Sequence, residues 1–263
     1  MFDRQASVFD QRAWLPVDCC RLVAGAVLEI AEVAPGDLIF EIGAGTGRIG
    51  RHFGTPSRYL GLDLSAGMLN EYQRSDALVG DRMLVRADAN EDWPLAGGVA
   101  RVVFSSRTLH RLDHNHVATE VNRVASPAGA TLLIGRVKRE RDSVRKRMSA
   151  EMREQLRLRG FHGRGVDHQD RELIEACLAR GWEVREPISV AKWNVASNPR
   201  QSLDSWRQVQ GLAGIDVPDA TRLEILADLE AWAGATFGGL DQTVESEESY
   251  VLKPILIRPA HPV

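Results

Sequence analysis

Hydrophobic and polar residues follow two different spacings along the first half of the chain. Residues 17–33 repeat apolar side chains at intervals of three and four, which predicts an amphipathic helix. Short apolar runs then alternate with segments of helical spacing, and each run predicts a buried strand, at 38–42, 59–62, 83–86, 102–106 and 130–134. This alternation predicts parallel strands joined by right-handed crossovers, with helices on both faces of the sheet.

Two long segments interrupt this pattern in the second half of the chain. Residues 170–180 predict another helix, and residues 183–190 and 250–258 predict strands, but residues 137–169 and 191–249 separate these elements. Structureless loops of that length are uncommon in a compact domain, so we expect both segments to fold as helices. We also expect them to form a cap together over the carboxyl ends of the strands, where open α/β sheets bind ligands.

Composition and charge exclude several classes of protein. The length of 263 residues suits one large α/β domain or such a domain with a cap, and the net charge of −3 gives no overall attraction to nucleic acid or an anionic membrane. Cys19, Cys20 and Cys177 lack metal-ligand spacing, so we expect buried thiols and no metal site. Without a targeting pattern or a membrane-spanning apolar run, we expect a cytoplasmic protein, whose oligomeric state stays open.

A glycine-rich turn follows the first predicted strand, in residues 41–47, EIGAGTG. Glycine has no Cβ to keep a ligand away from the backbone, and it tolerates the positive φ angles of a tight strand-to-helix turn. We expect such a turn to present backbone N–H groups at a helix N-terminus, where nucleotide-like ligands bind.

Acidic residues follow the next two predicted strands. Asp63 ends the second strand, where a carboxylate is placed to hold ribose hydroxyls, and Asp88 follows the third. Each also has a structural interpretation, Asp63 as a turn residue and Asp88 as part of an Asx turn. Their joint order and spacing with Glu41 favours a ligand site.

In this order, the motifs resemble those of class I S-adenosylmethionine-dependent methyltransferases, in particular the small-molecule branch related to ubiquinone and menaquinone biosynthesis enzymes. The resemblance covers residues 2–136 closely and the final strand pair more loosely. It implies an α/β fold with a seven-stranded, mostly parallel, doubly wound (Rossmann-like) sheet, whose last strand lies antiparallel beside the fifth, and an inserted helical cap. It also implies S-adenosylmethionine as cofactor and methyl transfer to oxygen or nitrogen of a small organic acceptor.

The resemblance completes the expected organisation of the chain. An S-adenosylmethionine-binding core with an N-terminal lid is followed by two cap segments that alternate with the rest of the core. The expected parts are 1–136 (core and lid), 137–169 (cap), 170–190 (core helix and strand), 191–249 (helical cap) and 250–263 (final core strand and tail).

The resemblance also assigns roles to individual residues. Glu41 and the glycines are expected to surround the amino acid end of the cofactor, and Asp63 is expected to hold the ribose. The adenine contacts are expected from Leu64, Met68, Asp88 and Ala89, and Ser105 is expected near the methionine portion. The full expected set is Glu41, Gly43, Ala44, Gly45, Gly47, Asp63, Leu64, Met68, Asp88, Ala89 and Ser105. For Met68 a place in the hydrophobic core is the structural alternative.

For the acceptor, His110 is the candidate general base, because it follows the fourth predicted strand and histidine accepts protons near neutral pH. A structural role in packing the loop is the alternative. Phe9, in the segment that resembles the family's entry lid, His110 and Trp193 in the cap are candidate acceptor contacts.

A nicotinamide-dependent oxidoreductase is the main rival, because residues 45–50, GTGRIG, satisfy the dinucleotide fingerprint literally. The position of the fingerprint relative to the predicted strand argues against this class of enzyme. The fingerprint should begin directly after the strand, at Gly43, and its third glycine would then fall on Arg48.

The two interrupting segments differ in charge. Residues 138–164 are strongly basic and residues 216–248 strongly acidic, which is typical of solvated helix faces or of two helices drawn together. The rival hypothesis is an RNA or protein methyltransferase that docks through 138–164, but that segment lacks interleaved aromatic residues for base stacking, so nucleic acid is not an expected partner. A third hypothesis is a non-catalytic nucleotide-binding partner subunit.

Overall fold

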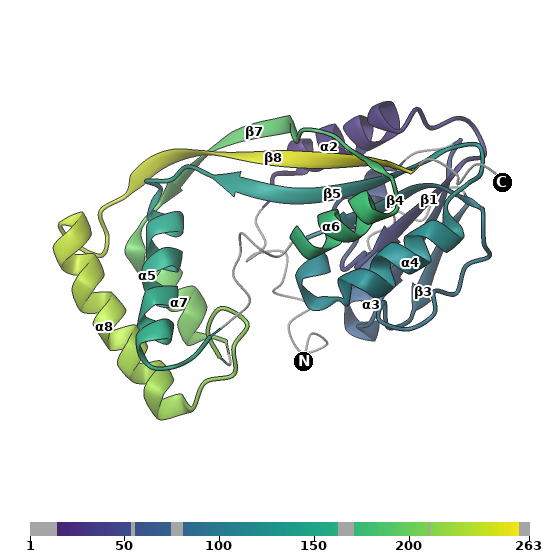
Figure 1. Ribbon diagram of the computed structural model, residues 1–263. Coiled ribbons are helices and arrows are strands. Elements are labelled where there is room, and N and C mark those ends of the chain that lie inside the picture. The colour runs from purple at the N-terminus through teal and green to yellow at the C-terminus, as the bar shows by residue number, and fades with distance from the viewer. Residues whose placement is uncertain (1–14, 54–55, 75–80, 163–170, 210, 258–263) are drawn as a thin grey trace. The chain divides into compact units, whose positions relative to one another are not determined.

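The computed structural model describes residues 15–53, 56–74, 81–162, 171–209 and 211–257. The chain divides into two compact units (Figure 1). Unit 1 comprises Met1–Arg136, Val166–Ala191 and Tyr250–Val263, and unit 2 comprises Val137–Gly165 and Lys192–Ser249. Each unit therefore collects segments that are distant in the sequence.

The described residues form an eight-stranded, mixed sheet with the order β3-β2-β1-β4-β5-β8-β6, and β7 pairs with β8. The pairs β1–β2, β1–β4, β2–β3 and β4–β5 are parallel, whereas β6 and β8 are antiparallel. The strands are β1 (Leu38–Ile42), β2 (Arg58–Asp63), β3 (Arg82–Arg86), β4 (Ala100–Ser106), β5 (Ala130–Arg139), β6 (Glu183–Val184), β7 (Ile188–Ser197) and β8 (Val244–Ile257).

The predicted α/β fold and mostly parallel sheet are confirmed, but the count of seven strands is wrong. The single strand predicted at 183–190 is two strands, β6 and β7, and Pro187 lies between them. Proline interrupts a strand because it has no N–H group for the hydrogen-bond ladder. The last strand does lie beside β5, and their arrowheads point in opposite directions in Figure 1.

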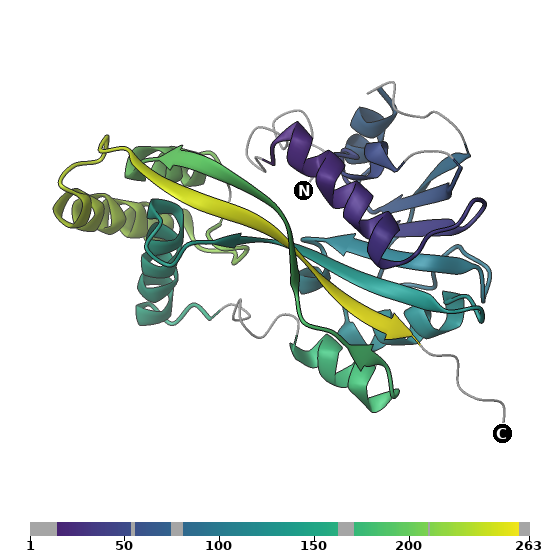
Figure 2. The same cartoon turned by 90° about the horizontal axis from the view of Figure 1, so that it is seen from above.

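Helices cover both faces of the sheet in unit 1, and Figure 2 shows α2 and α6 on opposite sides of it. The described helices of this unit are α2 (Val17–Ile30), η2 (Gly50–His52), α3 (Ala66–Arg74), η3 (Leu109–Arg111), α4 (His114–Val124) and α6 (Arg171–Ala179). One core cluster joins Phe40 and Ile42 of β1 to Val121 of α4 and Cys177 of α6, all of them 0% exposed. Cys19 and Cys20 are also buried, as predicted.

Unit 2 has a hydrophobic core of its own. Its helices are α5 (Val144–Leu158), α7 (Pro199–Arg207) and α8 (Asp219–Phe237). Met148 and Leu156 of α5, Leu203 of α7 and Leu229 of α8 belong to one buried cluster. The segments expected to be purely helical also contain strand, because β7 continues to Ser197 and β8 begins at Val244.

Opposite charges from the basic and acidic segments meet within unit 2. Arg139 and Arg145 both contact Glu248, at 2.9 Å and 3.3 Å, and the Glu248 side chain is only 2% exposed. Arg159, directly after α5, also pairs with Asp228 of α8. The interpretation of two helices drawn together by charge therefore fits unit 2 better than a continuous basic surface does.

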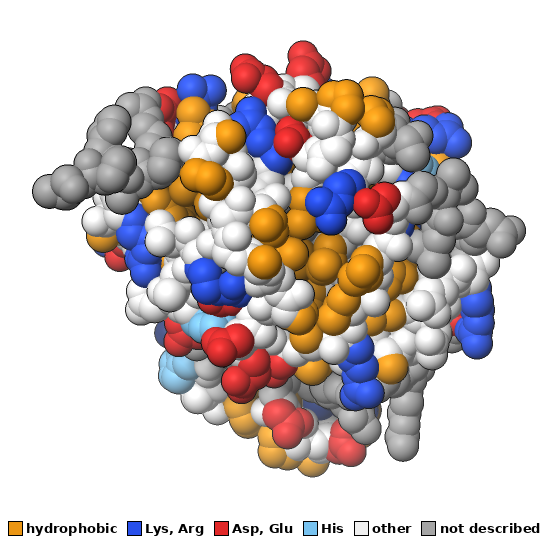
Figure 3. All heavy atoms as spheres, turned by 90° about the vertical axis from the view of Figure 1, so that its right-hand side faces the viewer, with side chains coloured by type: hydrophobic (Ala, Val, Ile, Leu, Met, Phe, Trp, Pro, Cys, Tyr) orange, Lys and Arg blue, Asp and Glu red, His pale blue; other side chains and the backbone are white. Residues whose placement is uncertain are grey.

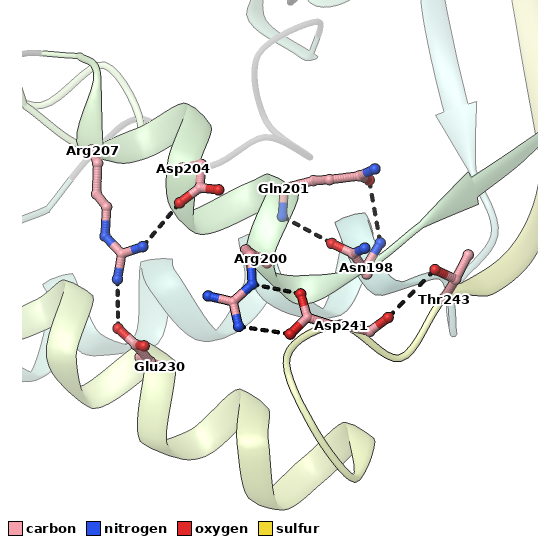
Figure 4. A network of polar contacts seen from close by, with 8 residues as sticks. All are labelled: Asn198, Arg200, Gln201, Asp204, Arg207, Glu230, Asp241 and Thr243. Carbon is pink, nitrogen blue, oxygen red and sulfur yellow. Dashed lines mark hydrogen bonds and ion pairs between the residues drawn. The ribbon is translucent and has the colours of Figure 1, made fainter.

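Polar contacts also fix α7 in unit 2 (Figure 4). Asn198 and Gln201 form a capping box at the start of α7, in which each side chain binds the backbone N–H of the other residue. Arg200 binds both carboxylate oxygens of Asp241, at 2.5 Å and 2.7 Å, and Arg207 pairs with Glu230 of α8. These contacts tie α7 to α8 and to the loop before β8.

Charges of both signs also mix on the molecular surface. Figure 3 shows one face on which basic and acidic side chains are scattered around a central group of hydrophobic ones. Such a face has no continuous field of a single sign to attract a polyanion.

The separate core of unit 2 can be tested with Met148→Ala. Met148 is fully buried, so its truncation should lower the free energy of unfolding by about 2–5 kcal/mol. Leu158→Ala on the same helix is the matched control, because Leu158 is 62% exposed and its loss should change stability by no more than about 0.5 kcal/mol. Chemical denaturation followed by intrinsic fluorescence measures both changes. Equal effects of the two substitutions would contradict the core assignment.

Candidate active site

A cavity of about 430 Å³ lies in unit 1 at the carboxyl ends of the parallel strands. Its lining comes from the turn after β1, from the ends of β2 and the start of α3, from the loop after β3, and from the segment after β4. A volume in the range of about 300–1,000 Å³ is typical of small-molecule sites.

Nine of the eleven residues predicted to bind the cofactor line this cavity, and His110 lines it as well. The nine are Glu41, Gly43, Ala44, Gly45, Asp63, Leu64, Met68, Asp88 and Ala89. The structure thus brings together residues from three separate strand ends. Their contact with a bound cofactor stays a prediction.

The other two predicted residues, Gly47 and Ser105, are not part of the cavity lining and pack within the protein instead. Gly47 has a φ of +73°, and a Cβ there would collide with the ring of Tyr72, so this glycine permits close packing against α3. Ser105 is 0% exposed, and its hydroxyl donates to the Ile42 carbonyl at 3.1 Å. The next residue, Ser106, lines the cavity in its place, because neighbouring residues of a strand face opposite sides.

The glycine turn does not present free N–H groups at a helix, which corrects the sequence-based expectation. The N–H groups of Gly43 and Ala44 both donate to the Leu62 carbonyl, that of Gly45 donates to Asp63, and that of Gly47 donates to the Ala44 carbonyl. The chain then enters the short 3₁₀ helix η2 rather than an α-helix. What the turn offers a ligand is a backbone without Cβ atoms.

Asp63 is fixed by two backbone donors. Its Oδ2 accepts from Gly45 N–H at 2.8 Å, and its Oδ1 accepts from Ser65 N–H at 2.9 Å. This arrangement holds the carboxylate in place at the cavity wall, and a carboxylate can accept about four hydrogen bonds. The geometry suits hydroxyl groups that donate in pairs, such as those of a ribose.

Glu41 is buried beneath the turn, with a side chain held by Tyr59. Tyr59 Oη donates to Glu41 Oε2 at 2.5 Å, and Glu41 is 3% exposed. Burial raises the pKa of Glu41 to about 8, the nearby Asp63 charge adds to this rise, and the hydrogen bond from Tyr59 opposes it. Without a ligand, the protonated form of Glu41 therefore dominates at neutral pH.

Asp88 combines the two interpretations that the sequence left open. Its Oδ1 accepts from Asn90 N–H at 2.9 Å, which is the hydrogen bond of an Asx turn. It also lines the cavity next to Ala89. The turn orients the carboxylate, so the structural role supports a binding role rather than replacing it.

Several lining residues at the end of β4 and directly after it were not predicted from the sequence. Ser106, Arg107, Thr108 and Arg111 line the cavity together with His110. The signal that could have identified them is their position directly after a predicted strand, where α/β sheets bind ligands. The positive φ of Arg107, 61°, has no signal in the sequence.

The cavity does not test the other two candidate acceptor contacts. Phe9 is outside the described residues. Trp193 belongs to β7 in unit 2, where it is 9% exposed and its indole N–H has no hydrogen-bond partner among the described residues. An acceptor-binding role of either residue stays a prediction.

Comparison with known proteins identifies the class. Residues 39–129 match the family described as a methyltransferase domain. Similar solved structures include a protein of Bacillus halodurans described as a candidate methyltransferase (14% identity, 90% of this chain and 99% of that chain covered, TM-score 0.59) and YcgJ of Bacillus subtilis (16%, 90% and 98%, 0.58). A SAM-dependent methyltransferase of Aquifex aeolicus is 19% identical, and the match covers 72% of this chain and 92% of that chain with a TM-score of 0.51. A comparison with curated proteins finds no match.

The matched residues run from β1 to the loop before β5 and include the glycine turn and all three cavity carboxylates. Residues 39–129 therefore carry a methyltransferase domain, the fold is that of class I S-adenosylmethionine-dependent methyltransferases, and the methyl donor is S-adenosylmethionine. The hypotheses of a nicotinamide enzyme and of a non-catalytic subunit are thereby set aside. Membership of the ubiquinone and menaquinone branch stays a prediction. No described helix is long and apolar enough to span a membrane.

The cavity residues fit this donor. A Cβ placed on Gly45 would meet no atom closer than the Gly43 carbonyl oxygen at 4.0 Å, so the cavity wall is open at this residue. Carboxylates at three strand ends provide acceptors for the hydroxyl, amino and ammonium groups of the donor, and Leu64 and Met68 provide apolar surface for a base.

The protonation of Glu41 gives the stability of the ligand-free protein a defined pH dependence. In the unfolded chain, glutamate has a pKa of about 4.3. Between that value and about 8, the folded state holds one more proton at Glu41, so its contribution to the free energy of unfolding falls as the pH rises. Glu41→Gln removes this effect. As the pH rises through this range, the free energy of unfolding of the variant should increase relative to that of the wild type by up to about 1.4 kcal/mol per pH unit.

Denaturation at about pH 5.5 and about pH 7.5 measures this difference, within the range where the two states differ in bound protons. Glu29→Gln is the control, because Glu29 is an exposed carboxyl on α2. A stability difference between Glu41→Gln and the wild type that does not change with pH would contradict the raised pKa of Glu41.

Proposed function

We propose that this methyltransferase moves the methyl group to oxygen or nitrogen of a small organic acceptor that enters the unit 1 cavity. The observation that carries the proposal is the size and composition of that cavity, in which the glycine turn, three carboxylates and the segment with His110 line one space. It has the dimensions of a small-molecule site, and it extends from the proposed donor contacts to the segment after β4.

The residues of the cavity act by holding and orienting. S-adenosylmethionine supplies an electrophilic methyl group on a sulfonium centre. Asp63, braced by Gly45 and Ser65, fixes the ribose, and Asp88 with Ala89 fixes the adenine. Glu41 lies beneath the turn that surrounds the amino acid end, where a negative charge would stabilise the cationic donor. Alignment of donor and acceptor in this cavity is the main source of rate, worth up to about 7–11 kcal/mol in favourable cases.

His110 is the proposed general base for an acceptor that must lose a proton during attack. It lies in η3 and lines the cavity beside Arg111 and Leu112. In this role its ring nitrogen accepts the acceptor's proton while the acceptor atom attacks the methyl group. We further propose that Phe9 and Trp193 contact the acceptor.

Docking of RNA through residues 138–164 is less well supported. Arg139, Arg145 and Arg159 already contact acidic residues of unit 2. Arg147 lies over the Phe237 ring at 4.6 Å. Cations that are neutralised or stacked within their own unit contribute little to a phosphate-binding surface.

Donor binding can be tested with Asp63→Ala and isothermal titration calorimetry. Loss of charge-assisted hydrogen bonds to the ribose should weaken binding of S-adenosylmethionine and S-adenosylhomocysteine by about 10- to 150-fold, because each such bond contributes about 1.5–3 kcal/mol. Asp37→Ala is the matched control: Asp37 also braces a backbone N–H, that of Ala34 at 2.8 Å, but it does not line the cavity. Equal donor affinity in the two variants would contradict the proposed site.

The role of His110 can be tested with His110→Gln at saturating donor, once screening has identified an acceptor. Loss of the base should lower the turnover number by about 10²–10⁴-fold, while the Kd for S-adenosylmethionine changes by less than about twofold. His116→Gln is the control, because His116 is exposed and binds the Glu91 carbonyl. An unchanged turnover number in His110→Gln would remove the base from the mechanism.

A further inference from the structure

Apart from Arg48, the charged side chains of the cavity are separated by sign. Glu41, Asp63 and Asp88 follow β1, β2 and β3, whereas the segment 106–111 after β4 contributes two arginines and a histidine. Arg48, next to the glycine turn, is the remaining arginine of the lining. The cavity therefore has an acidic side, where the donor is proposed to bind, and a basic side at the end of β4.

The basic side is built on a firmly held segment. Tyr250, which is fully buried, donates from its hydroxyl to Ser106 Oγ at 2.6 Å. Thr108 fills the space where a Cβ of Gly43 would stand, so this threonine packs directly on the glycine turn. His114 Nε2 lies 3.1 Å from the Leu109 carbonyl oxygen, which fixes the next turn of the segment. These contacts give the segment a defined position in the cavity wall.

Arg107 carries backbone strain at the centre of this arrangement. Its φ of 61° is in the left-handed region, which is disfavoured for residues with a Cβ. Strained residues of this kind concentrate at binding and catalytic sites, where the surrounding contacts hold them. Here the strain allows a long cationic side chain to follow directly after Ser106 at the edge of the cavity.

Arginines outnumber the anionic groups of the donor in this cavity. S-adenosylmethionine has a single carboxylate, and three arginines line the cavity, Arg48, Arg107 and Arg111. Arg48 is the one nearest in sequence to the turn that is proposed to surround the amino acid end of the donor. Arg107 and Arg111 both follow β4, on the side where His110 is proposed to meet the acceptor.

We propose that the methyl acceptor carries an anionic group, a carboxylate or a phosphate, which Arg107 and Arg111 bind. This inference rests on the proposed donor site and adds the chemical class of the acceptor. The planar guanidinium group offers paired N–H donors that match both anions, and two arginines on one short segment supply the charge as well as the orientation. The anion would hold the acceptor with its nucleophilic atom toward His110 and the methyl group.

The test uses the protein saturated with S-adenosylhomocysteine and titrates it with sodium phosphate, sodium benzoate and the neutral benzamide. We expect phosphate or benzoate to bind, and benzamide to bind at least about tenfold more weakly than the preferred anion. The double variant Arg107→Gln/Arg111→Gln should lose at least about tenfold in affinity for that anion, with less than about twofold change for S-adenosylhomocysteine. The preference between phosphate and benzoate distinguishes the two kinds of anionic group.

Arg74→Gln is the matched control, because Arg74 is an exposed arginine of unit 1 that does not line the cavity. Equal anion affinity in the double variant and this control would overturn the proposal, as would absence of anion binding or equal binding of benzamide and benzoate. Failure of the donor site is recognised separately, because S-adenosylhomocysteine is titrated first. If it does not bind, phosphate titration of the unliganded protein still tests the arginine pair.

Discussion

The hydrogen bond from Gly45 N–H to the Asp63 carboxylate is the constraint on which the proposed donor site depends. It joins the turn after β1 to the end of β2 at 2.8 Å, and the Leu62 carbonyl adds two more bonds from Gly43 and Ala44. Gly45 has a φ of +56°, a conformation that favours glycine. Because of this bond, the open backbone of the turn and the carboxylate keep a fixed separation, and a ligand meets both at once.

The three glycines of the turn serve different neighbours. Gly43 makes room for Thr108 of the segment after β4, and Gly47 makes room for Tyr72 of α3, whereas Gly45 faces open space. Side chains at positions 43 and 47 would push away the elements that complete the cavity. The spacing of the glycines thus reflects the convergence of three elements on one turn, and only one of the glycines opens the wall to a ligand.

The fold and the acidic half of the site could be predicted because they depend on local pattern. Apolar runs that end in Glu41 or Asp63 place these carboxylates at one edge of a parallel sheet, whatever the details of packing. The choice between Ser105 and Ser106 could not be predicted, since a shift of one residue reverses the face of a strand. The contact of Gly47 with Tyr72 and the left-handed φ of Arg107 depend on tertiary packing, which leaves no local trace.

The hydrogen bonds of the turn also show how this chain can contain a dinucleotide fingerprint without a dinucleotide site. A pyrophosphate bound at a glycine-rich turn requires N–H groups that point at it. Here the N–H groups of Gly43, Ala44, Gly45 and Gly47 are used within the protein, by the Leu62 and Ala44 carbonyls and by Asp63. A turn whose donors are occupied in this way offers those N–H groups to no pyrophosphate. In this chain the hydrogen-bond partners of the turn, rather than its glycine spacing, therefore argue against a dinucleotide site.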